Sequence, residues 1–383
     1  NFSFQTLLER APSMFSNNNP HQALVDLHAN ALTGIQVPPE FWWASHTLTA
    51  AVLDLSGNSI TSIQPGVFQG ANIDNSLDLS GNSITSIQQS AFNGAHINGL
   101  DLSGNSITSI QDHAFHGATF DAILDLSGNS ITSIQDYAFW DAFMGFLDLS
   151  GNNITSIQWG AFYGATIRGK LVLSGNNITS VLQSAFQGTT IYGNLDLSSN
   201  SITSIQQSTF QGVTIYGNLD LSGNSITSIL DFAFRSAVIY TNLDLSGNSI
   251  MSIWYAFQST AIGGNVDLSG NNITAIPPGA FWHASINFCL NLSGSNIKYI
   301  QQNAFRHINI GNTLDLSGNN ISSIAGGANI GAFSNATTVN LDLSGNRLSA
   351  LQANTFAGLN INGYINLFNN NISVLQNGWY SAF

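Results

Sequence analysis

Charged residues are scarce in this 383-residue chain. Asp, Glu, Lys and Arg together make up 7% of it, whereas a typical soluble domain contains roughly 25%. Seven residues are Lys or Arg and twenty are Asp or Glu, so the formal net charge is −13. Binding to the phosphate backbone of nucleic acid depends on clustered Lys and Arg. We therefore expect no nucleic-acid partner. The polarity of the chain comes instead from Asn, Ser, Thr and Gln.

Cysteine and long apolar runs are also nearly absent. Cys289 is the single cysteine, which excludes an intramolecular disulfide framework and a cysteine-rich metal site. No apolar run approaches the roughly 20 residues of a membrane helix, so we expect no transmembrane segment in this chain. The sequence begins at Asn1 without the charged-then-apolar pattern of a secretory signal. We expect a processed or incomplete chain, and a cleaved secretory signal would fit.

The dominant feature is a short repeat. The eleven residues LDLSGNSITSI at 53–63 recur unchanged at 77–87, 100–110, 124–134 and 219–229. Alignment on the L-x-L element gives fifteen copies at intervals of 23 or 24 residues, apart from 28 after the first and 27 after the thirteenth. A fixed period of this length is typical of a solenoid, in which each coil buries its apolar stripe against the next.

The positions within one coil predict its local structure. LDLS alternates with period two, which predicts a short strand with both leucines inward and with Asp and Ser outward. The amide of Asn58, three residues after the second Leu, is expected to bond backbone groups of neighbouring coils. Ile60 and Ile63 follow as inward positions. Phe68 begins a column of phenylalanines that we expect to stack in the core.

These residues carry a family resemblance. The pattern L-x-L-x-x-N-x-I-x-x-I followed by A-F-x-G resembles the leucine-rich repeat of extracellular receptors and adhesion proteins, over about residues 25–383. The resemblance implies an α/β solenoid, namely a right-handed horseshoe of about fifteen coils. Its concave face would carry a parallel β-sheet, and its convex side would consist of loops or short helices.

The resemblance also suggests a domain organisation. We expect residues 1–22 to form an N-terminal capping segment and residues 23–383 to form the solenoid, with longer, irregular coils at 25–52 and 314–340. Many secreted members of the family close both ends with disulfide-bonded caps. This chain departs from that pattern because it has one cysteine.

The outward strand position carries Asp in most coils. Twelve of the twenty acidic residues fall there, and carboxylates about 5 Å apart repel by roughly 0.8 kcal/mol even in water. A basic or polar partner, or Ca²⁺, would relieve this repulsion. The alternative is that LDLS is simply the consensus of this repeat. The candidate concave-face binding residues are Asp54, Asp78, Asp101, Asp125, Asp148, Asp196, Asp220, Asp244 and Asp267.

Hydroxyl side chains form a second ladder. Ser59 and Thr61 flank an inward Ile, and their counterparts recur in later coils. Such an array resembles the flat faces of ice-binding solenoids, but Ser and Thr also suit exposed turns. In five coils Asn replaces this Ser within N-I-T or N-I-S, and glycans there would spoil a flat face. If the chain is secreted, the candidate N-glycosylation sites are Asn1, Asn153, Asn177, Asn272, Asn291, Asn320, Asn335 and Asn371.

Three tyrosines share one register just before the strand. Tyr192, Tyr216 and Tyr240 recur in consecutive coils, and exposed rings can stack on sugars or anchor a protein partner. The eight histidines are dispersed without a third ligand or a paired carboxylate cluster. Catalysis requires one unique site, whereas this sequence repeats the same residues in every coil. We predict a non-enzyme without a cofactor, with Ca²⁺ along the Asp column as the alternative.

Together these observations favour an extracellular or cell-surface protein. We expect it to bind a protein or a glycan through its concave face. The first alternative is a structural component that binds copies of itself and assembles into a filament, a cell wall or a surface layer, because the concave residues are unusually uniform. The second alternative is ice binding through the Ser/Thr ladders.

Overall fold

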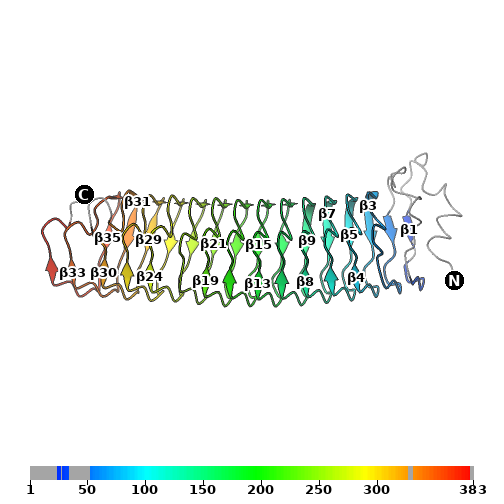
Figure 1. The fold of residues 1–383 in the computed structure, drawn as a ribbon, viewed down its shortest axis with the longest axis horizontal. Helices are drawn as coiled ribbons and strands as arrows, with labels where there is room; N and C mark the ends of the chain where they lie inside the picture. The colour runs from blue at the N-terminus through cyan, green and yellow to red at the C-terminus, as the bar shows by residue number, and fades with distance from the viewer. Residues whose placement is uncertain (1–23, 27, 34–51, 327–330, 380–383) are drawn as a thin grey trace. The chain divides into compact units, whose positions relative to one another are not determined.

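The computed structural model describes residues 24–26, 28–33, 52–326 and 331–379. The expected N-terminal cap at 1–22 and most of the long coil at 25–52 lie outside these residues. Backbone contacts divide the chain into two compact units, Asn1–Asn194 and Leu195–Phe383. Each unit is a stack of coils built from short parallel strands (Figure 1).

In the first unit, the strands that carry the L-x-L element form one parallel sheet, which we call the LxL sheet. Leu53 pairs with Leu77, and Leu100 pairs with Leu124, so equivalent positions of successive coils lie side by side. In the later coils the strand is interrupted, and β11 and β12 both pair with β9. The strands are β1 (Leu24–Asp26), β2 (Val52–Asp54), β3 (Asn72–Asp78), β5 (His96–Asp101), β7 (Thr119–Asp125), β9 (Phe143–Asp148), β11 (Thr166–Ile167), β12 (Leu171–Val172) and β14 (Thr190–Ile191).

The second unit repeats this pairing between the L-x-L strands of successive coils. The L-x-L strands are β15 (Leu195–Asp196), β18 (Leu219–Asp220), β21 (Leu243–Asp244), β23 (Val266–Asp267), β26 (Leu290–Asn291), β29 (Thr313–Asp315), β32 (Asn340–Asp342) and β35 (Ile365–Asn366). The strands that precede them are β17 (Thr214–Ile215), β20 (Val238–Ile239), β22 (Ala261–Ile262), β25 (Ser285–Ile286), β28 (Asn309–Ile310), β31 (Ala336–Thr338) and β34 (Leu359–Ile361). In the irregular coil at 314–340, Leu314 still pairs with Leu341, so the additional residues do not disturb the register.

Most coils also contribute a second, two-residue strand that the sequence reasoning did not predict. We call the sheets of these strands the SI sheets. In the first unit they comprise β4 (Ser86–Ile87), β6 (Ser109–Ile110), β8 (Ser133–Ile134), β10 (Ser156–Ile157) and β13 (Ser180–Val181). In the second unit they comprise β16 (Ser204–Ile205), β19 (Ser228–Ile229), β24 (Ala275–Ile276), β27 (Tyr299–Ile300), β30 (Ser323–Ile324), β33 (Ala350–Leu351) and β36 (Val374–Leu375).

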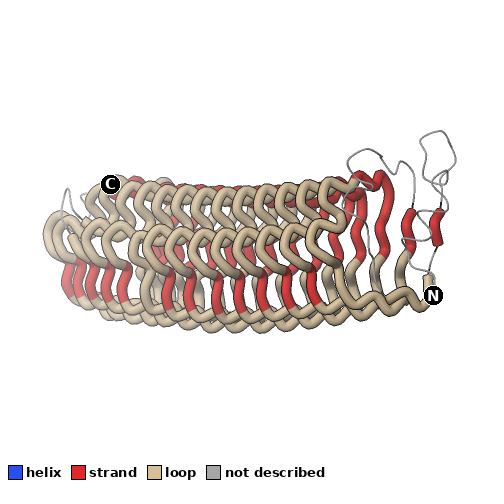
Figure 2. Tube along the Cα trace, turned by 45° about the vertical axis from the view of Figure 1, so that its right-hand side comes forward, coloured by secondary structure: helices blue, strands red, loops and turns tan. Residues whose placement is uncertain are grey.

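The expectation of short helices is not met. Figure 2 shows strands and loops but no helix among the described residues, so the α/β class is corrected to a parallel β-solenoid there. The turn at Gln64–Gly70 explains why. Gly66 and Gly70 have φ of 67° and 63°, and such left-handed residues four positions apart interrupt a right-handed helix. The turn instead makes bonds of the three-residue type, such as Gln69 N–H to Gly66 O at 3.0 Å. The right-handed coiling, the horseshoe curvature and the count of about fifteen coils stay predictions.

The expected phenylalanine spine is confirmed in both units. In the first unit, neighbouring rings from Phe68 to Phe186 lie 5.0 to 5.3 Å apart between centroids and are nearly parallel. In the second unit, the stack runs from Phe210 to Phe356. These rings are at most 2% exposed, so they fill the width of the coil between the two kinds of sheet.

The predicted asparagine ladder is also confirmed. The Asn129 side-chain amide donates hydrogen bonds to the carbonyls of Leu126 in its own coil and Leu102 in the preceding coil, at 3.1 and 2.9 Å. Its Oδ1 accepts from the N–H of Ile107 in the preceding coil, at 3.0 Å. Where Ser295 replaces Asn, its hydroxyl donates to the carbonyl of Leu268 in the preceding coil, at 3.0 Å. A buried turn is thereby satisfied by one side chain per coil.

Candidate functional site

The structure arranges the predicted aspartates into one column on the LxL sheet of each unit. Asp54 and Asp78 pair directly, as do Asp220 and Asp244. The first unit aligns Asp54, Asp78, Asp101, Asp125 and Asp148, and the second aligns Asp196, Asp220, Asp244 and Asp267. All nine side chains are partly exposed. The sequence pattern therefore placed these carboxylates correctly within each unit.

Each aspartate also has a local structural task. Oδ1 of Asp54 accepts hydrogen bonds from the N–H and the hydroxyl of Ser56 at 2.9 and 2.6 Å. The N–H bond recurs in the other eight coils at 2.8 to 3.0 Å. Asn291 makes both bonds with its amide oxygen, at 3.0 and 2.7 Å. The column therefore closes the turn after each strand, which gives a physical reason for the LDLS consensus.

The turn hydrogen bonds also affect ionisation at Asp54. Partial burial raises the pKa of Asp54, but the hydroxyl and N–H of Ser56 and the charge of His28 lower it, and the balance lies below its usual value of 3.8. His28 Nδ1 lies 2.8 Å from the Ser56 hydroxyl oxygen. The carboxylate is thus held in its charged form by groups that bind its oxygen.

Ca²⁺ along the column stays a prediction. Within the described residues, no three His, Cys, Asp or Glu side chains gather as a preformed metal site. Because one oxygen of each aspartate already accepts a turn hydrogen bond, an ion would draw mainly on the second oxygen and on water. Dedicated Ca²⁺ sites use six to eight oxygens.

Tyr216 and Tyr240 are neighbours in the second unit. The rings of Tyr216 and Tyr240 stack with centroids 4.5 Å apart and an angle of 3° between their planes. They are 40% and 52% exposed. Tyr192 is likewise exposed but belongs to the first unit. In the coil after Tyr240, a Cβ at Gly263 would come within 2.2 Å of the Tyr240 carbonyl oxygen, so only glycine fits there.

The candidate glycosylation sites differ in exposure. Asn153, Asn177, Asn272, Asn335 and Asn371 are exposed, and Asn291 and Asn320 are half-buried. Asn1 lies outside the described residues.

The threonine ladder is hydrogen-bonded along its length in the first unit. The Thr108 hydroxyl donates to the Thr85 carbonyl at 3.1 Å, and Thr132 donates to Thr108 at 3.2 Å. Asn153 and Asn177 replace the neighbouring serine in two coils of this unit. Ice binding stays a prediction.

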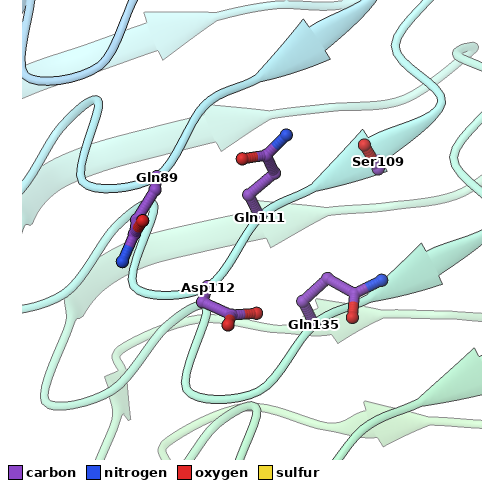
Figure 3. Close-up of a pocket in the computed structure, with 5 residues that line it drawn as sticks. All are labelled: Gln89, Ser109, Gln111, Asp112 and Gln135. Carbon is purple, nitrogen blue, oxygen red and sulfur yellow. The ribbon is translucent and has the colours of Figure 1, made fainter.

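A polar hollow of about 290 Å³ lies beside β6 in the first unit. Figure 3 shows the Asp112 carboxylate between the side chains of Gln89 and Gln135, with Gln111 and Ser109 completing the lining. Sequence reasoning missed this site because its residues come from three coils. Gln and Ser at these positions also resemble their counterparts elsewhere in the repeat.

Aromatic side chains cluster directly beyond the hollow. His113 follows Asp112 in sequence, and Tyr137 lies two residues after Gln135. The imidazole of His116 stacks on Trp140 at 4.6 Å, and Tyr137 meets Trp159 edge-on at 4.8 Å. Sequence reasoning recorded only dispersed histidines. The coil alignment would have revealed the cluster, because His113 and Tyr137 share one repeat position.

Comparison with known proteins identifies the repeat. The family described as "BspA type Leucine rich repeat region" matches residues 44–168 with six copies, and the family "Leucine rich repeat" matches 193–250 and 265–321. No curated protein matches the sequence. No helix of the described residues is long and apolar enough to cross a membrane.

Several solved structures are similar. The Toll protein of Drosophila, solved with Spatzle, is 16% identical with a TM-score of 0.44; the match covers 83% of this chain and 48% of that chain, so this chain spans about half of it. A leucine-rich-repeat protein of Leptospira interrogans is 18% identical with a TM-score of 0.40, covering 98% of this chain and 90% of that one. The leucine-rich-repeat domain of APL1B is 20% identical with a TM-score of 0.38, and the match covers 83% of this chain and 87% of that one. Because the family models together match more than half of the residues, this chain belongs to the leucine-rich-repeat proteins.

Proposed function

We propose that this protein is a non-enzymatic, extracellular or cell-surface binding scaffold that takes a protein or glycan ligand on its LxL sheet. The observation that carries the proposal is the in-register column of partly exposed aspartates in each unit. Each carboxylate uses one oxygen for its turn, as Asp54 does, and the other oxygen contributes to a line of negative charge. With about fifteen coils, the same surface would be presented many times.

The chemistry of the column favours a ligand with positive charge. Neighbouring carboxylates at the roughly 5 Å spacing of parallel strands repel one another, and a basic protein surface would relieve this repulsion and bind faster at low salt. The exposed Tyr216 and Tyr240 rings lie just before the strands of the second unit and add stacking area for the same ligand.

The decisive experiment removes charge without removing the turn bond. In the triple variant Asp78→Asn, Asp101→Asn and Asp125→Asn, each amide oxygen can still accept from the following serine, as Asn291 does. Binding of poly-L-lysine is measured by surface plasmon resonance over a range of salt concentrations. We expect weaker binding and a smaller salt dependence in the triple variant, because three charges of the column are lost.

The control variant changes the same number of charges elsewhere in the first unit. Asp112→Asn, Asp136→Asn and Asp141→Asn alter three exposed aspartates outside the LxL sheet. Equal weakening by both triple variants would show only an effect of net charge and would contradict the proposal. Filaments or layers of the purified protein in negative stain would instead favour the self-assembling alternative, and their loss in EDTA would assign Ca²⁺ a bridging role along the column.

A further inference from the structure

Two of the side chains that line the polar hollow beside β6, Ser109 and Gln111, depart from the pattern of their coil position. In the coils before and after it, the Gln side chain donates to the Ser hydroxyl two residues earlier, as Gln88 does to Ser86 at 2.8 Å and Gln135 to Ser133 at 2.8 Å. Gln111 and Ser109 make no such bond, and neither side chain has another hydrogen-bond partner within the described residues. The hollow therefore presents an amide and a hydroxyl whose hydrogen-bonding capacity is unused.

The neighbouring aromatic cluster occupies left-handed backbone. His113 and Tyr137 have φ of 56° and 55°, at the turn position that glycine fills in Gly66 and Gly160. Ser90, Ser184 and Phe232 have a positive φ at the same position of other coils, so this conformation belongs to the repeat. The ring of Tyr137 lies over Gly160, where an added Cβ would come within 3.0 Å of it. His113 and Tyr137 use this turn position to hold their rings in the cluster.

The rings form a platform rather than a cage. Centroids in the set His113, His116, Tyr137, Trp140 and Trp159 lie 4.6 to 5.8 Å apart, which is direct contact and leaves no space between them for a cation. The rings are tilted or edge-on to one another, at 26° to 89° between their planes, so they pack against and orient Trp159. Trp159 is 43% exposed, and a flat ligand can stack on the face of this ring.

We propose that the hollow and this aromatic platform together bind a neutral carbohydrate. The hollow is lined by three glutamine amides, one hydroxyl and a single carboxylate, a set that donates to and accepts from neighbouring sugar hydroxyls. The platform, which begins at His113 next to Asp112, supplies the apolar face on which a pyranose ring stacks. This site belongs to the SI sheet and its turns in the first unit, so it is separate from the LxL sheet.

The test uses the full chain and a panel of neutral polysaccharides, namely cellulose, chitin, β-1,3-glucan, amylose and mannan. Sedimentation with the insoluble polymer identifies the one that binds, and calorimetry with its soluble oligosaccharide gives the dissociation constant. We expect Tyr137→Gly to raise this constant by at least about tenfold and Gln111→Ala by about fivefold. Tyr137→Gly suits the backbone, so loss of binding in a variant with unchanged circular dichroism reports the ring.

Two further variants test whether the effect is specific to this site. Tyr299→Ala removes an exposed ring from β27 in the second unit, outside both proposed sites, and should leave the dissociation constant unchanged. Tyr137→Phe retains the ring and should bind within about twofold of the wild type, since stacking depends on the ring and not on the hydroxyl. Failure of all five polysaccharides to bind overturns the proposal, as does wild-type affinity in Tyr137→Gly. Binding of tetramethylammonium that Tyr137→Gly abolishes, without carbohydrate binding, would overturn it in favour of a cationic ligand.

Discussion

At the scale of single residues, the column of aspartates serves both the fold and the surface. Asp125 accepts from the N–H of Ser127 at 2.9 Å, and the equivalent oxygen is used in the same way in the other eight coils of the column. Val172 occupies this position in one coil, so the repeat tolerates one missing acceptor. The charge of the column is therefore not required by the turn, because Asn291 closes the turn without it.

Substitution of Asp125 separates these two roles. Asp125→Asn should leave the free energy of unfolding unchanged, because the amide oxygen still accepts from Ser127. Asp125→Val should lower it by about 1 kcal/mol through loss of that hydrogen bond. Urea unfolding followed by circular dichroism measures both. If Asp125→Asn lowers the free energy of unfolding as much as Asp125→Val does, the negative charge of Asp125 itself stabilises the turn.

A second residue-scale prediction concerns the stacked imidazoles of His283 and His307, whose centroids lie 4.8 Å apart. Desolvation lowers the pKa of His307 below 6.5, and the charges of His283 and Arg306 lower it further. A folded-state pKa below the unfolded one means that the unfolded chain binds the proton more readily. The contribution of His307 to the free energy of unfolding is therefore fully present above pH 6.5, and it declines as the pH falls from 6.5 through the folded-state pKa.

NMR titration measures the pKa of His307, and His283→Gln should raise it. An unchanged pKa in that variant would exclude a contribution from His283.

At the scale of structural elements, each coil is held to the next by the asparagine ladder. Asn129 bonds groups in two successive coils, so its removal leaves a buried N–H and buried carbonyls without partners. Ser295 shows that a hydroxyl can replace part of this arrangement, since it donates to the preceding coil but has a single oxygen.

We expect Asn129→Ala to lower the free energy of unfolding by about 3 kcal/mol, since buried unsatisfied groups cost about 1–3 kcal/mol each. Asn129→Ser should cost clearly less, because its hydroxyl can reach the Leu102 carbonyl as Ser295 reaches its counterpart. Denaturant titration of both variants checks the order. Equal losses would show that the shape of the amide, and not its hydrogen bonds, matters at this position.

The sequence predicts a structural feature well when the residues that form it have the same task in every coil. Leu53, Asn58 and Phe68 have fixed tasks in every coil, and their burial and contacts follow from the period. For the segment after the SI strand, the sequence allowed loops or short helices, and the described residues show loops; the short helices were not excluded from the sequence because left-handed residues such as Ser90 and His113 are not glycine. The aspartate column was predictable for the same reason as the core. The hollow was not, because Gln111 differs from Gln88 only in the direction of its side chain.

At the scale of the whole molecule, stability in each unit comes from contacts between equivalent positions of neighbouring coils. Leu77 pairs with Leu100 and Leu100 pairs with Leu124, with the same residue types on both sides. Phe92, Phe115 and Phe139 stack at 5.3 and 5.1 Å. In such a solenoid the stability is approximately a sum of coil and nearest-neighbour terms, so one coil should be removable if the register is kept.

Deletion of residues 100–123, one complete coil, tests this expectation. Leu124 would then take the place of Leu100 in the chain, so Leu77 would face Leu124 and Asn82 would face Asn129. We expect a folded protein with a small decrease in thermal midpoint, whereas deletion of residues 100–111 alone should unfold the neighbouring coils by moving outward residues into the core. Circular dichroism and thermal unfolding distinguish the two.

The complete deletion also reaches the proposed carbohydrate site, because it removes Ser109, Gln111 and Asp112 from the hollow. A folded variant that no longer binds carbohydrate would support the assignment of the site to this coil, whereas unchanged binding would contradict it. Equal unfolding by both deletions would show instead that the coils are not interchangeable, since a chain that merely sums equivalent neighbours should tolerate the loss of one complete repeat.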